Sequence, residues 1–326
     1  MRAAVYTRYG PPEVLEIKEV AKPVPRDNEV LVSVHAATVC TPDWRFRRPN
    51  PFFIRFMTGL WKPKKARILG MEFSGTVESA GKNVSRFRAG DQIFGSTGFQ
   101  LGTHAEYVCV PENGTVALKP ANMSLEESAA ILFGGFSALH FLRMAGIQAG
   151  QNVLIYGGSG SVGVFAVQLA KHFGARVTAV CSTTNLELMK SLGADEVVDY
   201  TKADFSRAGR VYDIVFDTVG KSGISRSLRG LKRGGALVQG GYSGLGSLIV
   251  WSTRSKWASL TGAAKPIGGM VRGTPEDQTF LKRLIEAGKL RTVIDRRYTL
   301  DQIREAHRHA EGGHKKGHVI VLMARP

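Results

Sequence analysis

A strand, a glycine-rich turn and a helix follow one another within Gln151–Gly174, and this stretch constrains the fold more than any other. It opens with a short apolar run, Asn152–Tyr156, of the kind that forms a buried parallel strand. After the turn, apolar residues recur at helical spacing, and a second apolar run, Arg176–Val180, comes next. The sequence therefore predicts a β-α-β unit whose first turn is Gly157-x-x-Gly160-x-x-Gly163.

Each glycine of this turn has its own physical role. Gly157 permits a tight turn, Gly160 lets a phosphate group approach the backbone, and Gly163 lets the helix pack closely on the strand. The amides at the helix start and the positive end of the helix dipole attract phosphate. A purely structural β-α-β turn is the alternative. We predict a dinucleotide site formed by the following residues of the turn: Gly157, Ser159, Gly160, Ser161, Val162 and Gly163.

Length and composition narrow the classes of protein. The chain has 326 residues, enough for two domains with apolar cores, and its apolar and charged fractions of 43% and 22% are ordinary. Its three cysteines are far apart and show no zinc-site spacing, which favours a reducing compartment. The start shows no signal peptide and no run of about 18 apolar residues occurs, so we expect a cytoplasmic protein without a membrane span.

The pattern of elements changes once along the chain. Residues 1–123 consist of short alternating runs separated by glycine and proline, which predicts a small antiparallel, barrel-like domain. From Ser124, the N-cap of a predicted capping box with Glu127, strands alternate with helices. We therefore predict a parallel, doubly wound sheet for residues 124–272, and a return of residues 273–326 to the first domain.

Several phrases, taken together and in order, resemble one family. They are YGPPEVLEIKEV, LGMEFSGTVESAGKNVSRFRAGD, HAEYVCVP, GGSGSVG, SLGADEVVDY and YDIVFDTVG. The chain thus resembles the medium-chain dehydrogenase/reductase superfamily, in its zinc-independent quinone oxidoreductase branch. The resemblance implies an α/β protein with a GroES-like catalytic domain, a Rossmann domain and a nicotinamide cofactor between them.

The resemblance also bears on zinc. Zinc-dependent members place a cysteine after the third strand, a histidine in a Gly-His-Glu phrase, and another cysteine or acid near the domain junction. Here Cys40 fills the first position, Met71 replaces the histidine, and the junction 132–135 offers no ligand. One ligand of three does not make a catalytic zinc site. Without such a Lewis acid, we expect reduction of an electrophilic quinone or α,β-unsaturated carbonyl rather than alcohol oxidation.

The choice of nicotinamide cofactor depends on the end of the second strand of the Rossmann sheet. An acid there would favour NADH, but the sequence reads Cys-Ser-Thr-Thr-Asn over 181–185, which favours NADPH. Relatives usually carry an arginine or lysine near this point, and none is present here, so NADH stays the alternative. We expect the adenosine phosphate to contact Ser182, Thr183, Asn185 and Tyr200; the serine and threonines also fit a helix start.

The remaining site residues follow from the resemblance. Near the cofactor it places Ser137, Thr218, Val219, Gly240 and Gly241. As candidate catalytic residues it brings in Cys40, Asp43 and Tyr242. Each of these three has a structural alternative: Cys40 as a small pocket residue, Asp43 as a buried carboxylate that caps amides, and Tyr242 as a packing aromatic.

Two stretches depart from a plain reductase. Residues 45–67 carry eight basic residues and no acid among aromatic ones, and residues 245–260 are amphipathic with two tryptophans. Walls of a pocket for a bulky acceptor are the simplest interpretation; contact with an anionic membrane surface is the sharper one, and nucleic-acid binding a third.

The formal charge of +17 fits all of these interpretations. The sequence thus predicts a zinc-independent NAD(P)H-dependent oxidoreductase acting on a quinone or enone. A zinc-free NADP-dependent alcohol dehydrogenase, or a cofactor-binding protein with a membrane- or nucleic-acid-contacting surface, is the alternative. By the resemblance we also expect a homodimer, paired through a strand near Lys265–Val271.

Overall fold

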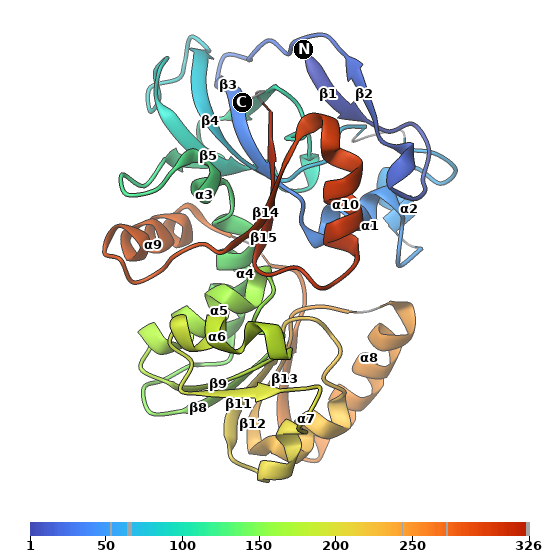
Figure 1. Cartoon of the computed structure of the whole chain (residues 1–326), viewed down its shortest axis with the longest axis vertical. Coiled ribbons are helices and arrows are strands. Elements are labelled where there is room, and N and C mark those ends of the chain that lie inside the picture. Colours follow the sequence, from blue (N-terminus) through green and yellow to red (C-terminus); the bar gives the residue numbers. More distant parts are fainter. Residues whose placement is uncertain (53, 64–66, 243, 272, 324–326) are drawn as a thin grey trace. The chain divides into compact units, whose positions relative to one another are not determined.

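The computed structural model of the protein describes residues 1–52, 54–63, 67–242, 244–271 and 273–323. Its contacts divide the chain into two compact units (Figure 1). Unit 1 comprises 1–133, 274–287 and 292–326, and unit 2 comprises 134–273 and 288–291. Most of the C-terminal segment therefore returns to the unit that contains the N-terminus, whereas residues 273 and 288–291 belong to unit 2. Among the helices within the described ranges, none is long and apolar enough to cross a membrane.

Unit 1 is built on a seven-stranded, mainly antiparallel sheet in the order β14-β15-β3-β4-β5-β7, with β6 also paired to β3. A two-stranded sheet, β1-β2, accompanies it. The strands are β1 (Arg2–Val5), β2 (Glu16–Glu19), β3 (Glu29–Thr38), β4 (Glu72–Ala80), β5 (Gln92–Ser96), β6 (Tyr107–Pro111), β7 (Thr115–Leu118), β14 (Ile294–Thr299) and β15 (His318–Leu322). Long β3 is the centre of the unit because it pairs with β4, β6 and the C-terminal β15.

The core of unit 1 is formed by alternate residues of these strands together with one C-terminal helix. Val30, Val32 and Val34 of β3 are buried in the same cluster as Ile303 and Ala306. The helical segments are η1 (Pro12–Val14), α1 (Thr41–Arg47), α2 (Ile54–Thr58), η2 (Gly98–Gln100), α3 (Leu125–Ala129), α9 (Pro275–Glu286), η5 (Leu300–Gln302) and α10 (Ile303–Glu311). The sequence pattern of residues 300–311 thus yields the helix that covers the first unit, not the second.

Helix α3 corrects the predicted boundary at residue 123. Its capping box forms as predicted, with the Glu127 amide donating to Ser124 Oγ at 3.2 Å. However, Ala129 and Ala130 pack against Ala36 of β3 and Ile320 of β15, so residues 124–133 belong to unit 1. The change of pattern at Ser124 marks a change of secondary structure, whereas the change of unit follows ten residues later.

Unit 2 is a parallel six-stranded sheet in the order β10-β9-β8-β11-β12-β13. The strands are β8 (Asn152–Tyr156), β9 (Arg176–Cys181), β10 (Glu196–Asp199), β11 (Tyr212–Asp217), β12 (Leu231–Gln239) and β13 (Ala264–Gly268). The helical segments are α4 (Leu132–Met144), α5 (Ser161–His172), η3 (Thr183–Asn185), α6 (Leu186–Ser191), η4 (Phe205–Ala208), α7 (Ile224–Gly230) and α8 (Leu245–Leu260).

This strand order is that of the Rossmann fold, with the direction of winding reversed between β8 and β11. In open parallel sheets, ligands bind beyond the carboxyl ends of the strands at such a reversal. The predicted fold class, a GroES-like domain and a doubly wound parallel sheet, is confirmed.

Candidate functional site

The glycine turn of unit 2 leaves space where a phosphate group needs it. Gly157 follows the last residue of β8 and has a φ of +78°, a backbone conformation that favours glycine. A Cβ atom added at Gly160, the N-cap of α5, would meet only the Gly157 carbonyl oxygen, at 3.5 Å. A Cβ atom added at Gly163 would lie 2.2 Å from that same oxygen, so the backbone at the start of α5 packs directly against the turn. The backbone geometry thus supports a tight turn at Gly157 and close packing at Gly163, and it leaves space at Gly160, where the approach of a phosphate group stays a prediction.

Two further segments lie against this turn at the carboxyl edge of the sheet. Thr218 donates its hydroxyl hydrogen to the Tyr156 carbonyl at 2.9 Å, and a Cβ at Gly157 would touch Val219 at 2.3 Å. The Gly240 amide donates to the Asp217 carbonyl at 2.8 Å. The ends of β8, β11 and β12 thus meet around residues 157–163, and this places Thr218, Val219, Gly240 and Gly241 beside the glycine turn.

The end of β9 carries an amide side chain in a network of hydroxyl groups. Asn185 is buried and donates through Nδ2 to Ser159 Oγ at 3.0 Å and to Ser182 Oγ at 3.1 Å. Its Oδ1 is buried and has no hydrogen-bond partner among the described residues. Three predicted site residues, Ser159, Ser182 and Asn185, are therefore in direct contact, although 26 residues separate the first from the last.

A carboxylate reaches the same place from the neighbouring strand. Asp199 ends β10 and pairs with Cys181 across the sheet. It accepts hydrogen bonds from Thr183 Oγ1 at 2.5 Å and from Thr201 Oγ1 at 2.7 Å, which hold the pKa of this carboxyl below its usual range. The expectation that no acid lies at the end of the second strand is correct for the sequence of that strand. The expectation did not include Asp199, which the parallel register of β9 and β10 places beside the end of the second strand.

Tyr200 follows Asp199 and is half exposed. Its amide donates to the Cys181 carbonyl at 3.1 Å, and its ring centroid lies 6.5 Å from that of Tyr156. An aromatic ring is therefore available at the mouth of the hydroxyl network. Tyr242 lies elsewhere, packed against the core cluster of Trp251, and burial raises the pKa of its hydroxyl. Ser137 lies buried on α4.

In unit 1, Cys40 and Asp43 form the start of helix α1. The two oxygens of the fully buried Asp43 accept hydrogen bonds from the Cys40 amide at 2.7 Å, the Cys40 thiol at 3.0 Å and the Gly70 amide at 2.9 Å. The capping alternative for Asp43 is therefore the arrangement seen. Burial raises the pKa of the Cys40 thiol far above its ordinary value, and the Asp43 and Glu72 carboxylates raise it further.

Glu72 is a functional candidate that the sequence analysis used only as part of a phrase. It accepts hydrogen bonds from Thr38 Oγ1 at 2.7 Å and from the Phe133 amide at 2.6 Å. Its burial raises the pKa of this carboxyl to about 7, while burial lowers the pKa of Lys315 to about 8. Unit 1 thus holds a buried acid and a buried amine whose pKa values are both shifted toward neutrality, a pattern found at functional sites and in structural ion-pair networks. The sequence signal that could have identified Glu72 is a carboxylate at the start of a largely buried strand, β4.

The groups at the inherited zinc position do not fit zinc. Zinc binds a cysteine as its thiolate, whereas the Cys40 thiol lies 3.0 Å from Asp43, to which it donates a hydrogen bond. Met71 contributes a thioether, and both Glu72 oxygens are engaged by Thr38 and Phe133. Over the ranges that the structure describes, no three histidine, cysteine or carboxylate side chains are grouped to hold a metal ion.

The basic stretch 45–67 lies in unit 1 and is described apart from Phe53 and residues 64–66, which fall outside the described residues. Phe46 is buried in the core and Arg47 is fully buried, bound to Glu311 at 2.5 Å. Phe52, Phe56 and Trp61 are exposed. The stretch is therefore partly core and partly surface, which neither simple interpretation of it anticipated.

Comparison with known proteins agrees with the geometry. Residues 26–120 match the family described as alcohol dehydrogenase GroES-like domain, and residues 192–321 match the one described as zinc-binding dehydrogenase. A 2-methylene-furan-3-one reductase from Solanum lycopersicum is 33% identical, over 98% of this chain and 79% of its own. An NADPH-dependent alkenal/one oxidoreductase from the chloroplast of Arabidopsis thaliana is 30% identical, with the same two coverages.

The solved structure of a quinone oxidoreductase from Coxiella burnetii is 30% identical and superimposes with a TM-score of 0.88, over 99% of each chain. Fold, strand order, glycine turn and these relatives lead to one assignment. The chain belongs to the medium-chain dehydrogenase/reductase superfamily of NAD(P)H-dependent oxidoreductases, in the branch of the quinone oxidoreductases and enone reductases.

Proposed function

We propose that the protein is an NADPH-dependent reductase of quinones or α,β-unsaturated carbonyls that works without zinc. The observation that carries the proposal is the open space at Gly160, at the reversal point of a Rossmann sheet and at the start of helix α5. Relatives whose names specify a quinone, an alkenal or enone, and a furanone as substrates support the acceptor class.

The residues of unit 2 divide into three groups by what they would hold. The amides of residues 157–163 and the dipole of α5 hold the pyrophosphate. Thr218, Val219, Gly240, Gly241 and Ser137 support the nicotinamide half. When bound, the nicotinamide supplies the hydride; the chain supplies position, exclusion of water and stabilisation of the negative oxygen that forms on the acceptor.

The third group is the hydroxyl network at the end of β9, to which we assign the choice of NADPH over NADH. Ser182 offers a hydroxyl group and Tyr200 offers a ring at the position of the adenosine ribose, beside Thr183 and Asn185, whose own hydrogens are donated to Asp199 and to Ser159 and Ser182. The negative charge of Asp199 opposes a 2′-phosphate, but it is engaged by two threonine hydroxyls and lies 4.0 Å from Lys202. We therefore propose a preference for NADPH that is smaller than an arginine at this position would give.

The proposed class of acceptor rests on the donor set around Cys40, Met71 and Glu72, which does not fit zinc. Reduction that proceeds without a Lewis acid favours an acceptor that is already electrophilic, as quinones and conjugated carbonyls are. Cys40 and Asp43 act as positioning residues, because their hydrogen bonds fix the start of α1 after β3. We do not assign the final proton to Tyr242, whose raised pKa and packing in the core favour a structural role.

The test is a titration of the purified protein with NADPH and with NADH, followed by tryptophan fluorescence, and then a screen of quinones, enones and alcohols after removal of metal by a chelator. We expect tighter binding of NADPH and reduction of quinones or enones at an unchanged rate without metal. Alcohol oxidation with NADP⁺ as the main activity would favour a zinc-free alcohol dehydrogenase instead. Activity that returns only when zinc is added would refute the metal-free mechanism.

A further inference from the structure

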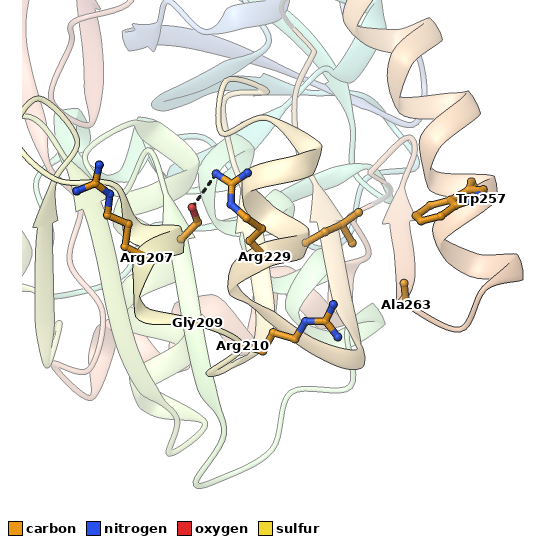
Figure 2. A pocket seen from close by; sticks show the side chains of 8 residues that line it. Arg207, Gly209, Arg210, Arg229, Trp257 and Ala263 are labelled. Atoms are coloured by element: carbon orange, nitrogen blue, oxygen red, sulfur yellow. Dashed lines mark hydrogen bonds between the residues drawn. The ribbon is translucent and has the colours of Figure 1, made fainter.

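A basic hollow lies in unit 2 at the edge of the sheet opposite the glycine turn. It has a volume of about 400 Å³, and Arg207, Arg210 and Arg229 line it together with Leu228 and Trp257 (Figure 2). We call these five residues the arginine pocket. Arg210 precedes the first residue of β11, whereas the glycine turn follows the last residue of β8, a strand parallel to β11. The arginine pocket is therefore separate from the proposed cofactor site.

The positive charge of the arginine pocket is only partly neutralised by its surroundings. Arg229 donates to Ser206 Oγ at 3.1 Å and lies 3.6 Å from Asp204. The exposed guanidinium groups of Arg207 and Arg210 form no hydrogen bond or ion pair with any residue in the described ranges. Residues 201–265 contain eleven lysines and arginines and three aspartates. The arginine pocket thus presents two free cations around an apolar floor.

Each of the three aspartates is already engaged. Asp213 is paired with Lys232 at 2.8 Å, and Asp217 accepts hydrogen bonds from the amides of residues 219, 220 and 222. Asp204 accepts from the Ser206 amide at 2.9 Å. Asp204 and Asp213 thus pair with other cations and Asp217 binds backbone amides, so none of the three forms an ion pair with Arg207 or Arg210.

Helix α8 extends the arginine pocket with an exposed apolar face. Trp257 is 61% exposed and Leu260 is 88% exposed, while Trp251 and Ala258 on the opposite side of the helix are buried in the core. Ile249, which lies nearer the start of α8, is 55% exposed. Arg254 and Lys256 add cations beside these residues. Tryptophan and leucine exposed among basic residues are typical of helices that lie at a membrane interface.

We propose that the arginine pocket and the outer face of α8 form a docking surface for membranes that contain anionic phospholipids. The guanidinium groups of Arg207 and Arg210 match a headgroup phosphate, and Trp257 and Leu260 enter the boundary between headgroups and acyl chains. Exposed Leu260 and Ile249 beside Trp257 favour lipid over nucleic acid, because aliphatic side chains offer no ring on which a base can stack. This surface would bring the protein to where apolar acceptors dissolve, and it acts independently of hydride transfer.

The experiment measures binding of the full chain to vesicles by sedimentation. Vesicles of phosphatidylcholine alone are compared with vesicles that contain about 30% phosphatidylglycerol. Three double variants are used: R207E/R210E, W257S/L260S and, as a control in unit 1, K82E/R88E, which reverses two exposed cations. Each cation near such a membrane contributes about fivefold in binding. We therefore expect binding to anionic vesicles only, weakened more than thirtyfold in R207E/R210E and clearly weakened in W257S/L260S.

The same expectation requires that K82E/R88E binds like the wild type, and that NADPH affinity is unchanged in all variants, which shows that they fold. Equal loss in K82E/R88E would mean unspecific attraction and would overturn the proposal. So would a change of oligomeric state in W257S/L260S without a loss of vesicle binding, since a second copy would then cover α8. Full displacement by inorganic phosphate or single-stranded DNA at constant ionic strength would assign the arginine pocket to those ligands and would also overturn it.

Discussion

Replacing Gly160 by alanine separates cofactor binding from folding. The added Cβ would have a single neighbour, the Gly157 carbonyl oxygen at 3.5 Å, which is an ordinary van der Waals contact. Gly160 has a φ of −79° and a ψ of 174°, angles that alanine adopts without strain. Alanine is a weaker N-cap than glycine, and its smaller unfolded-state entropy offsets this. We expect the free energy of unfolding of G160A to stay within about 1 kcal/mol of the wild type.

The binding of the cofactor should respond strongly to the same change. The methyl group would occupy the space through which the pyrophosphate approaches the amides of α5, and the loss of one hydrogen bond to a charged group costs about 1.5–3 kcal/mol. This corresponds to NADPH binding weakened by about tenfold to a hundredfold. The assay is calorimetric titration with NADPH, with the unfolding midpoint in urea measured in parallel.

Gly246→Ala, in the first turn of α8, is a matched control, because a Cβ at Gly246 meets no atom of the described residues within 4 Å and Gly246 is not part of the glycine turn. It should leave NADPH affinity unchanged. A G160A protein that is folded and binds NADPH as tightly as the wild type would show that the phosphate does not pass Gly160, and would refute the assignment of the turn.

Further predictions concern stability. Gly163→Ala should unfold more easily by about 1–3 kcal/mol, because its Cβ would lie 2.2 Å from the Gly157 carbonyl; urea denaturation of G163A beside G160A checks the contrast. The pKa of Glu72 is raised from 4.5 to about 7, so its stabilising contribution is present below pH 4.5 and is lost as the pH rises through 7. In the wild type, this titration should lower the free energy of unfolding by about 3 kcal/mol between pH 4.5 and pH 7, and Glu72→Gln should remove this fall. The pKa of buried His318 is lowered from 6.5 to about 3, so its contribution is lost as the pH falls from 6.5 towards 3. His318→Asn should flatten the acid side of the same curve, and an unchanged curve in either variant would contradict the assigned titrations. Ser124→Ala should cost about 1 kcal/mol through loss of the capping box, without an effect on cofactor binding.

Local patterns of the sequence were sufficient for the fold and for part of the site. The period-2 runs of unit 1, the apolar runs of unit 2 and the Gly157-x-x-Gly160-x-x-Gly163 turn depend on neighbouring residues only, and the structure places them as predicted. The capping box at Ser124 and the helix end at Gly174, with its φ of +79°, are likewise local. The domain boundary was displaced because packing of Ala129 and Ala130 on β3 is not a local property.

What the sequence did not show depends on pairing between distant segments. Asp199 meets Thr183 only through the register of β9 against β10. Glu72 has its hydrogen-bond partners 34 and 61 residues away, at Thr38 and Phe133, and its burial among such distant segments is the main cause of its raised pKa. The side chains of the arginine pocket come from η4, α7, α8 and the loop before β11. No contiguous sequence motif therefore predicts this pocket. The predicted homodimer and the cytoplasmic location stay predictions.

Transfer of deuterium from NADPH labelled at the reactive C4 position of its nicotinamide tests the central claim most directly. The acceptor is a simple α,β-unsaturated ketone, the protein is first treated with a chelator, and its zinc content is determined. The account predicts one deuterium at the β-carbon of the saturated product, detected by mass spectrometry, with zinc well below one atom per chain. A product without deuterium, or transfer that requires stoichiometric zinc, would contradict it.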